Sequence, residues 1–541
     1  MLVLGLNGYF GADHDAGSAL LREGALVAAV EEERLTRSKR AVNSKPGLSA
    51  REVLDVAGHH AAEVDVIAYP WLPRPFRLDP ADEKAAIISH LRSSGLLLRS
   101  NVEVEFVPHH EAHAWSGLVF TPEEHRKQCD IVVIDGSGES TSGGRFKFEN
   151  EILEHRASFS FESSIGFFYE AATLIAGFGW GEEGKLMGLA SYADPKAVPL
   201  ETASRLASLL AVENAAVGLP ELAPDFVSVI SEWGRRLLGD RAQPRTFIER
   251  ARLAALAQSA LEMRVDEIVR ESTAPTVILT GGTALNCTNN GRLAKALAER
   301  GQLLVVPPCA SDTGIAIGAA ARVASRYGEI HSTSSALQGR ACSAADFKRS
   351  AGESLSLKEA DAADLAIRLA EGQIVGWVHG RAEIGPRALG ARAILARPSS
   401  TRTRDRLNLV KGRETWRPLA PSVTAAEFGR SFVGISNAHM LMAADVAPQV
   451  EGLAGVTHVD GSARPQVVGS DQRAYQDVIR RFSAAVSGPE AVICTSFNAA
   501  GEPMVYSAAD AIRSARRMGL DAIAGEGWIA ELRTDSGSEC S

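Results

Sequence analysis

A recurring pattern limits the fold of this chain more than any other feature: a short apolar strand runs directly into a loop of glycines, small residues and carboxylates. Four copies occur, each given by its strand and its loop: residues 2–6 and 8–18, 131–134 and 135–141, 277–279 and 280–286, and 303–306 and 307–314. Glycines let the backbone approach a ligand closely, and their N–H groups can bind phosphate oxygens. A single loop of this kind is typical of many turns, but four copies favour an α/β fold that handles a nucleotide at its strand ends.

A second feature is the pair of histidines that follows residues 102–107. Those residues alternate in polarity as a strand does, and Pro108 suits the first turn of a helix because its missing N–H has no partner there. His109 and His113 then lie on one helical face, at the spacing that two imidazoles need to share a metal ion. His110 is rotated about 100° away. Hydrogen-bonded core histidines are the alternative that the pattern leaves open.

Length and charge define the broad class of protein. A chain of 541 residues exceeds one hydrophobic core, and the serine-rich stretch 332–339 suggests a boundary between a domain at 1–340 and another at 341–541. The net charge of −9 is spread along the chain, which argues against a nucleic-acid surface or a polybasic membrane anchor. Six cysteines form no CxxC pair, and no apolar run reaches the roughly 20 residues of a membrane span. We therefore expect reduced thiols and a cytoplasmic location.

The second half of the chain carries basic and polar residues next to glycine or proline, or just after an apolar strand. They lie in four separate stretches, at residues 380–392, 411–421, 458–464 and 494–498. In a chain of negative net charge, such guanidinium groups and small residues suit a pocket for a polyphosphate. Lys411 lies beside Gly412, so we expect it to act there as a point charge. A solvated basic surface is the alternative.

Taken together, these motifs resemble those of the O-carbamoyltransferases related to the nodulation enzymes and to the enzymes that tailor antibiotics. The matching stretches are Asp13-His14-Asp15-Ala16, Glu31-Glu32-Glu33-Arg34, His109-His110-Glu111-Ala112-His113-Ala114, Gly184-Lys185-Leu186-Met187-Gly188-Leu189, Thr280-Gly281-Gly282 with Asn286, Asp312-Thr313-Gly314, Gly385-Pro386-Arg387-Ala388-Leu389-Gly390, Arg417-Pro418-Leu419-Ala420-Pro421-Ser422 and Thr495-Ser496-Phe497-Asn498. They cover nearly the whole chain. Two departures are Ala16-Gly17-Ser18 in place of the more usual Ala-Ser-Ala, and a chain shorter than several antibiotic-tailoring relatives.

The resemblance implies a fold and a reaction. The fold is α/β, with a duplicated actin-like (ASKHA) N-terminal domain followed by a YrdC-like α+β domain. The YrdC-like domain would use carbamoyl phosphate and ATP to make carbamoyl-adenylate. The actin-like domain would then transfer the carbamoyl group to a hydroxyl of a small molecule, such as an antibiotic or another natural product.

The resemblance also implies roles for individual residues. It gives His109, His113, Asp135 and Asp312 as metal ligands, with iron(II) as the metal, although this donor set suits iron, manganese or zinc about equally. Carbamoyl phosphate and ATP would contact Arg387, Lys411, Arg417, Arg464, Ser496 and Asn498. A nucleotide in the first domain would contact Lys185, Gly281, Gly282 and Asn286, although a lysine such as Lys185 can also snorkel. His14 and Asp13 are the candidates for positioning the acceptor and taking its proton.

The sequence also leaves two rival functions open. A sugar kinase or ATPase of the actin-like superfamily would also place phosphate-binding loops after strands, but it leaves the histidine and aspartate set and the basic C-terminal half unexplained. A binding module regulated by ATP is the non-enzymatic alternative. No stretch singles out one acceptor, and the oligomeric state is left open.

Overall fold

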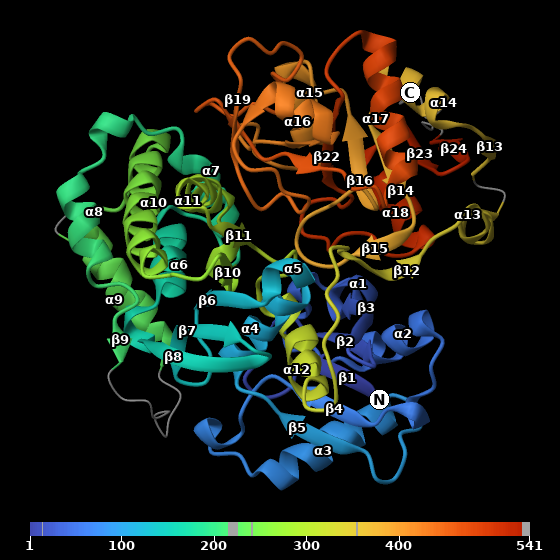
Figure 1. Cartoon of the computed structure of the whole chain (residues 1–541). Coiled ribbons are helices and arrows are strands. Elements are labelled where there is room, and N and C mark those ends of the chain that lie inside the picture. The colour runs from blue at the N-terminus through green and yellow to red at the C-terminus, as the bar shows by residue number, and fades with distance from the viewer. Residues whose placement is uncertain (13, 215–224, 240–241, 353–354, 533–541) are drawn as a thin grey trace, which may run out of the picture. The chain divides into compact units, whose positions relative to one another are not determined.

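The computed structural model describes residues 1–532 except 13, 215–224, 240–241 and 353–354. The chain forms two compact units (Figure 1). The first comprises Met1–Thr36 and Arg40–Ser334, and the second comprises Arg37–Lys39 and Ser335–Ser541. Both units combine helices with sheets, which confirms the α/β class.

The first unit contains two sheets of the same design. One has the order β3-β2-β1-β4-β5. Its strands are β1 (Leu2–Asn7), β2 (Gly17–Arg22), β3 (Ala25–Glu31), β4 (Val66–Tyr69) and β5 (Glu103–Phe106). The first three strands form an antiparallel meander, whereas β4 runs parallel to β1 and β5 parallel to β4.

The other sheet repeats this arrangement in the order β11-β10-β6-β7-β8-β9. Its strands are β6 (Gln128–Ile134), β7 (Thr141–Glu149), β8 (Ile152–Ser160), β9 (Glu213–Asn214), β10 (Thr276–Thr280) and β11 (Leu303–Val305). Again a three-stranded meander is followed by two parallel strands, with the short β9 added at the edge. This repetition agrees with the duplicated actin-like domain that the resemblance implies.

Two helices of the first unit approach each other at backbone contact. They are α4 (His109–Val119) and α12 (Ile315–Ala324), which pack against each other while α12 also covers β1 and β2. A side chain on Gly318 would collide with the carbonyl oxygen of Ala112, and one on Gly5 would collide with that of Ala316. The small residues of α12 therefore let α4 and β1 come close to it.

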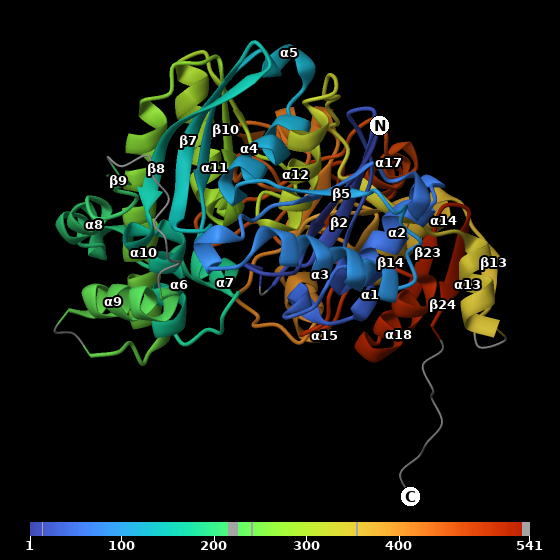
Figure 2. The ribbon, with the colours of Figure 1, turned by 90° about the horizontal axis from the view of Figure 1, so that it is seen from below.

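The remaining helices of this unit surround the sheets. They are α1 (Glu32–Thr36), α2 (Gly47–Ala57), α3 (Pro80–Ser93), α5 (Glu123–Arg126), α6 (Ile165–Ile175), α7 (Glu183–Ala190), α8 (Leu200–Ala207), α9 (Phe226–Leu238), α10 (Phe247–Arg270) and α11 (Cys287–Glu299). The long helix α10 packs against α6, α7 and α8, and α9 packs on α6, so that these helices gather beside the second sheet (Figure 2). Among the described residues, no helix combines the length and the apolar character that crossing a bilayer requires.

The second unit is built on an eight-stranded mixed sheet of order β13-β24-β23-β14-β16-β22-β17-β21. Its strands are β13 (Leu357–Glu359), β14 (Val375–Val378), β16 (Arg392–Ala396), β17 (Ala420–Val423), β21 (Gln466–Val467), β22 (Ala491–Ser496), β23 (Ala522–Gly525) and β24 (Trp528–Glu531). Two small sheets pair β12 (Leu337–Ala341) with β15 (Arg381–Glu383), and join β18 (Phe432–Val433), β19 (Ala444–Val446) and β20 (Ser462–Ala463).

Hydrophobic clusters cover both faces of the large sheet. One contains Ile394, Ile493 and Trp528, and the other contains Trp377 and Tyr475. The helices of this unit are α13 (Ala344–Ala351), α14 (Ala362–Ala370), α15 (Thr401–Val410), α16 (Ala425–Ser431), α17 (Arg473–Val486) and α18 (Ala508–Met518). This mixed sheet with helices is the α+β domain that the YrdC-like resemblance implies.

Candidate metal centre and basic pocket

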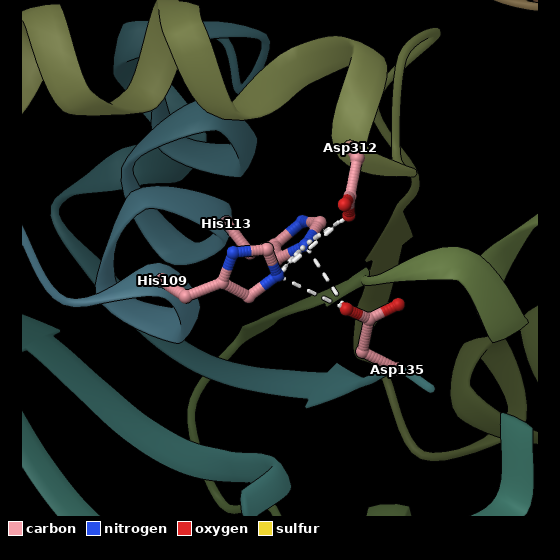
Figure 3. Close-up of side chains that lie close together, drawn as sticks. All are labelled: His109, His113, Asp135 and Asp312. Atoms are coloured by element: carbon pink, nitrogen blue, oxygen red, sulfur yellow. Dashed lines mark hydrogen bonds and ion pairs between the residues drawn. The ribbon is translucent and has the colours of Figure 1, made fainter. Parts of the chain in front are cut away.

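Four side chains converge in the first unit, where the ends of two strands meet α4 and α12 (Figure 3). His109 and His113 lie one turn apart on α4, Asp135 directly follows β6, and Asp312 lies just before α12. The Nε2 atom of His109 is 3.1 Å from Asp135 Oδ2 and 3.6 Å from Asp312 Oδ1. The Nε2 atom of His113 is 3.4 Å and 3.3 Å from the same two oxygens, and 3.2 Å from that of His109.

These distances fit a shared metal ion. Ligand atoms that bind one metal at about 2.0–2.2 Å stand about 3.0–3.5 Å from their neighbours. All four ligand atoms lie within 4.8 Å of one another. The set contains two carboxylates and two imidazoles, which can bind a metal in their neutral form. These donors suit a divalent transition metal.

The histidines and aspartates of this cluster shift one another's pKa values. Burial opposes the charged form of His113, but Asp135 and Asp312 raise its pKa to about 9. Burial likewise opposes the charged form of Asp135, yet the hydrogen bonds from His109 and His113 hold the pKa of its carboxyl well below the usual range. The Asp135 carboxylate is therefore ionised, as a metal ligand must be, whereas His113 would have to lose its proton to bind a metal.

Backbone and neighbouring groups complete the centre. The N–H of Gly282 donates to the second oxygen of Asp135, Oδ1, at 2.9 Å. His110 points elsewhere, with its Nδ1 3.0 Å from Thr141 Oγ1. Burial, together with the charge of His109, holds the pKa of His110 well below its usual range, so its ring is neutral. The separation of His110 from the two ligand histidines agrees with the helical rotation predicted from the sequence.

The candidate base loop lies between β1 and β2. His14 Nδ1 is 3.2 Å from Asp15 Oδ2, and the imidazole meets the ring of Trp180 edge-on with centroids 5.2 Å apart. The loop is tied down because Asp15 N–H donates to the carbonyl of Arg40 at 2.6 Å. Asp13, the other predicted residue here, lies outside the described residues.

The predicted nucleotide residues of the first unit occupy several different settings. Lys185, on α7, forms an ion pair with Glu182 at 2.6 Å. Gly281 takes a positive φ of 89°, where a side chain would collide with the Ile134 carbonyl. Asn286 is buried and accepts from the N–H of Asn289 at the start of α11, while its amide group donates to Gln258 at 2.8 Å. Their role toward a nucleotide stays a prediction.

Basic side chains cluster in the second unit where α15 ends opposite the end of β22, and we refer to this cluster as the basic pocket. Gly412, with a positive φ of 62°, lies just beyond the end of α15, where a left-handed glycine commonly ends a helix. Lys411 is only 1% exposed, and its ammonium donates to the carbonyl oxygens of Ser496 and Asn498 and to Asn498 Oδ1. The structure thus joins three of the predicted residues, Lys411, Ser496 and Asn498, in one hydrogen-bonded group.

Three arginines lie around this group. Arg413 reaches Thr495 Oγ1 at 3.4 Å and Ser496 Oγ at 3.3 Å. Burial, then the charges of Arg417 and Arg464, lower the pKa of Arg413 to about 9. Burial, then the charges of Arg413 and Arg417, hold the pKa of Lys411 well below its usual range. Such mutual effects show that the like charges share one region.

Arg413 belongs to the basic stretch 411–421 that the sequence indicates, two residues after Lys411. The predicted Arg387 lies on a separate loop between β15 and β16. That loop is held because Glu383 accepts from the N–H groups of Leu389, at 2.8 Å, and Arg392, at 3.0 Å.

Comparison with known proteins identifies the family. Residues 84–321 match the model of the carbamoyltransferase N-terminus, and residues 366–531 match that of the carbamoyltransferase C-terminus. The chain is 32% identical to the nodulation protein NolNO of Sinorhizobium fredii, over 98% of this chain and 80% of that protein. It is 33% identical to the nodulation protein NolO of Bradyrhizobium diazoefficiens, over 77% of each. It is also 34% identical to the 3'-hydroxymethylcephem-O-carbamoyltransferase of Streptomyces clavuligerus, over 47% of this chain and 48% of that enzyme.

The chain belongs to the carbamoyltransferase family. It is therefore a transferase enzyme, as the sequence motifs predict, and the kinase and binding-module alternatives do not describe its family.

Proposed function

We propose that this carbamoyltransferase uses carbamoyl phosphate and ATP to make carbamoyl-adenylate in the second unit, and that the first unit passes the carbamoyl group to a hydroxyl of a small molecule. Carbamoyl phosphate would lose its phosphate to water, and the resulting carbamate would attack the α-phosphate of ATP and release pyrophosphate. The acceptor oxygen would then take the carbamoyl group, releasing AMP and a proton.

The observation that carries the proposal is the cluster of Lys411, Arg413, Arg417 and Arg464 beside Ser496. Like charges held together in a partly dry site repel one another, and each lowers the tendency of its neighbours to stay charged. A substrate with several negative charges relieves that repulsion. The planar guanidinium groups can also bind phosphate oxygens in pairs.

In the first unit, His109, His113, Asp135 and Asp312 would hold one divalent metal. Such an ion supplies positive charge that stabilises negative charge developing on oxygen atoms. Iron(II) is the metal that the sequence resemblance implies, and manganese and zinc suit the same donors. Gly282 N–H, bonded to Asp135, fixes the orientation of that carboxylate.

His14 is our candidate for taking the proton of the acceptor hydroxyl, with Asp13 beside it in sequence. The carboxylate of Asp15, 3.2 Å from Nδ1, would stabilise the imidazole once it becomes charged. The cephem relative is named for an O-linked transfer to a small molecule, so we propose a hydroxyl of an antibiotic or another natural product as the acceptor.

Two classes of variant separate the half-reactions. Arg417→Ala and Arg464→Ala should abolish pyrophosphate release that depends on carbamoyl phosphate, because each removes a cation from the basic pocket. His109→Ala should leave that release largely intact and block formation of the carbamoylated acceptor, measured by mass spectrometry. Arg481→Ala, which removes a half-exposed arginine of the second unit, is the matched control. The division between units is wrong if His109→Ala stops pyrophosphate release as completely as Arg417→Ala does.

A further inference from the structure

The two candidate metal-binding imidazoles lack a feature common in metal centres. A histidine that binds a metal usually donates its second ring N–H to a carboxylate, a carbonyl or water, and this bond fixes the orientation of the ring. Here Nδ1 of both His109 and His113 is buried, and it has no hydrogen-bond partner among the described residues. Packing and backbone contacts must therefore orient these rings.

For His109, the packing comes from Trp71. The two ring centroids are 4.0 Å apart, with an angle of 39° between the ring planes. The indole is itself fixed, because its N–H donates to Asn7 Oδ1 at 3.2 Å. It also lies against Gly11, where any side chain would collide with the indole. Gly11 belongs to the same loop as His14, so Trp71 lies between that loop and a candidate metal ligand.

The backbone contact comes from Glu139, a buried carboxylate that is 2% exposed. Its Oε1 accepts two N–H groups, from His109 and from Leu72, each at 3.0 Å. The N–H of His109 belongs to the first residue of α4, and the N-cap residue of this helix, Pro108, makes no side-chain capping bond. The other N–H belongs to Leu72, the residue after Trp71. One oxygen therefore ties the start of the ligand-bearing helix to the backbone beside the indole.

We propose that Glu139 is a positioning residue of the metal centre, which holds the His109 imidazole in its binding orientation by fixing both α4 and Trp71. This inference rests on the proposed metal role of the four ligands. Glu139 is not one of the four proposed ligands. Its effect passes through the two N–H groups and the indole face.

The chain offers a matched control in Glu32. This residue is also 2% exposed, and it also caps a helix from a distance. It accepts from Leu48 N–H at 3.2 Å and Ser49 N–H at 2.7 Å, at the start of α2, whose N-cap residue Pro46 makes no side-chain capping bond. Because α2 carries none of the four proposed ligands, Glu32→Ala tests loss of a distant cap without loss of ligand positioning.

The experiment titrates the full-length protein, stripped of metal, with Co²⁺ while its visible absorption is recorded, and measures affinity by competition with a chelating dye. Glu139→Ala should weaken Co²⁺ binding about 10- to 100-fold, the usual effect of losing an outer contact of a ligand, and should change the absorption spectrum. Glu139→Gln should retain most of the affinity because the amide oxygen can still accept both N–H groups. Glu32→Ala should lower the melting temperature while leaving affinity and spectrum unchanged.

The inference is overturned if Glu139→Ala binds Co²⁺ with wild-type affinity and spectrum, or if Glu32→Ala loses affinity to the same extent. If Glu139→Ala does not fold, Trp71→Leu decides the question, because it removes the aromatic face against which His109 packs but keeps an apolar side chain at the site. A weaker affinity with an altered spectrum supports the inference, and wild-type values overturn it. Failure of the wild-type protein to bind Co²⁺ would instead overturn the metal assignment, and this inference with it.

Discussion

Replacing Lys411 by methionine tests the basic pocket most directly. Methionine has nearly the same length and volume but cannot donate a hydrogen bond. The carbonyl oxygens of Ser496 and Asn498, together with Asn498 Oδ1, would lose their charged donor. Such bonds contribute about 1.5–3 kcal/mol each, so about 5–9 kcal/mol is lost in gross terms.

Most of this lost hydrogen-bond energy should not appear as a decrease in the free energy of unfolding. The wild-type protein already bears the cost of burying the ammonium beside Arg413 and Arg417, which amounts to several kcal/mol and vanishes in the variant. We therefore expect a change in unfolding free energy of about 2 kcal/mol or less. Pyrophosphate release should fall much more, because removing one electrostatic contact from a catalytic site costs about 2–4 kcal/mol, or about 30- to 1,000-fold in kcat/KM.

Lys411→Arg distinguishes a caged ammonium from a free point charge. The side chain is buried, and oxygens surround Nζ, so the larger guanidinium should overpack the site at a cost of about 1–3 kcal/mol and fail to restore activity. The assay is steady-state pyrophosphate release at saturating ATP, with melting curves to monitor folding and Lys358→Met, an exposed lysine of the same unit, as control. Wild-type activity in either Lys411 variant would refute this reasoning.

Two further predictions concern metal and protons. His113→Ala and Asp312→Ala should each empty the metal centre, because each removes one of four ligands. His155→Ala, which changes an exposed histidine, should leave the metal bound. Elemental analysis that shows full metal occupancy in both ligand variants would contradict the assignment. Pyrophosphate binding should take up protons, because a bound anion raises the lowered pKa of Lys411, so affinity should fall as pH rises. Calorimetry in two buffers of different ionisation enthalpy measures this uptake, and equal uptake by Lys411→Met would assign it to another group.

Local patterns in the sequence predict much of the first unit. The apolar runs before Asp135 and after residue 101 become β6 and β5, and α4 begins at His109 as Pro108 indicates. The small residues of the 315–324 run indicate close packing, and α12 does contact α4 at Gly318. These features follow from periodicities of two or 3.6 residues, which a single segment carries by itself.

Contacts between distant segments could not be predicted in this way. Glu139 caps a helix that begins 30 residues earlier in the chain, and Lys411 meets Ser496 across 85 residues. The sequence suggested Lys411 as a point charge because Gly412 lies beside it, whereas the structure surrounds its ammonium with oxygens from the end of β22. Sheet order and helix packing decide which polar groups the folded chain brings together. The spacing of residues within one segment determines neither.

The short segment Arg37–Lys39 has a consequence for dividing the protein into parts. Although it comes early in the sequence, it belongs to the second unit. The Arg37 side chain donates to the carbonyl oxygens of Pro503 and Met504, at 2.9 Å and 2.6 Å, and its Nε is 3.6 Å from Asp510 Oδ1. The second unit is thus formed from two separate segments of the sequence. A fragment expressed from Ser335 onward would lack Arg37 and these contacts, so we expect the second unit to be less stable alone than in the full chain.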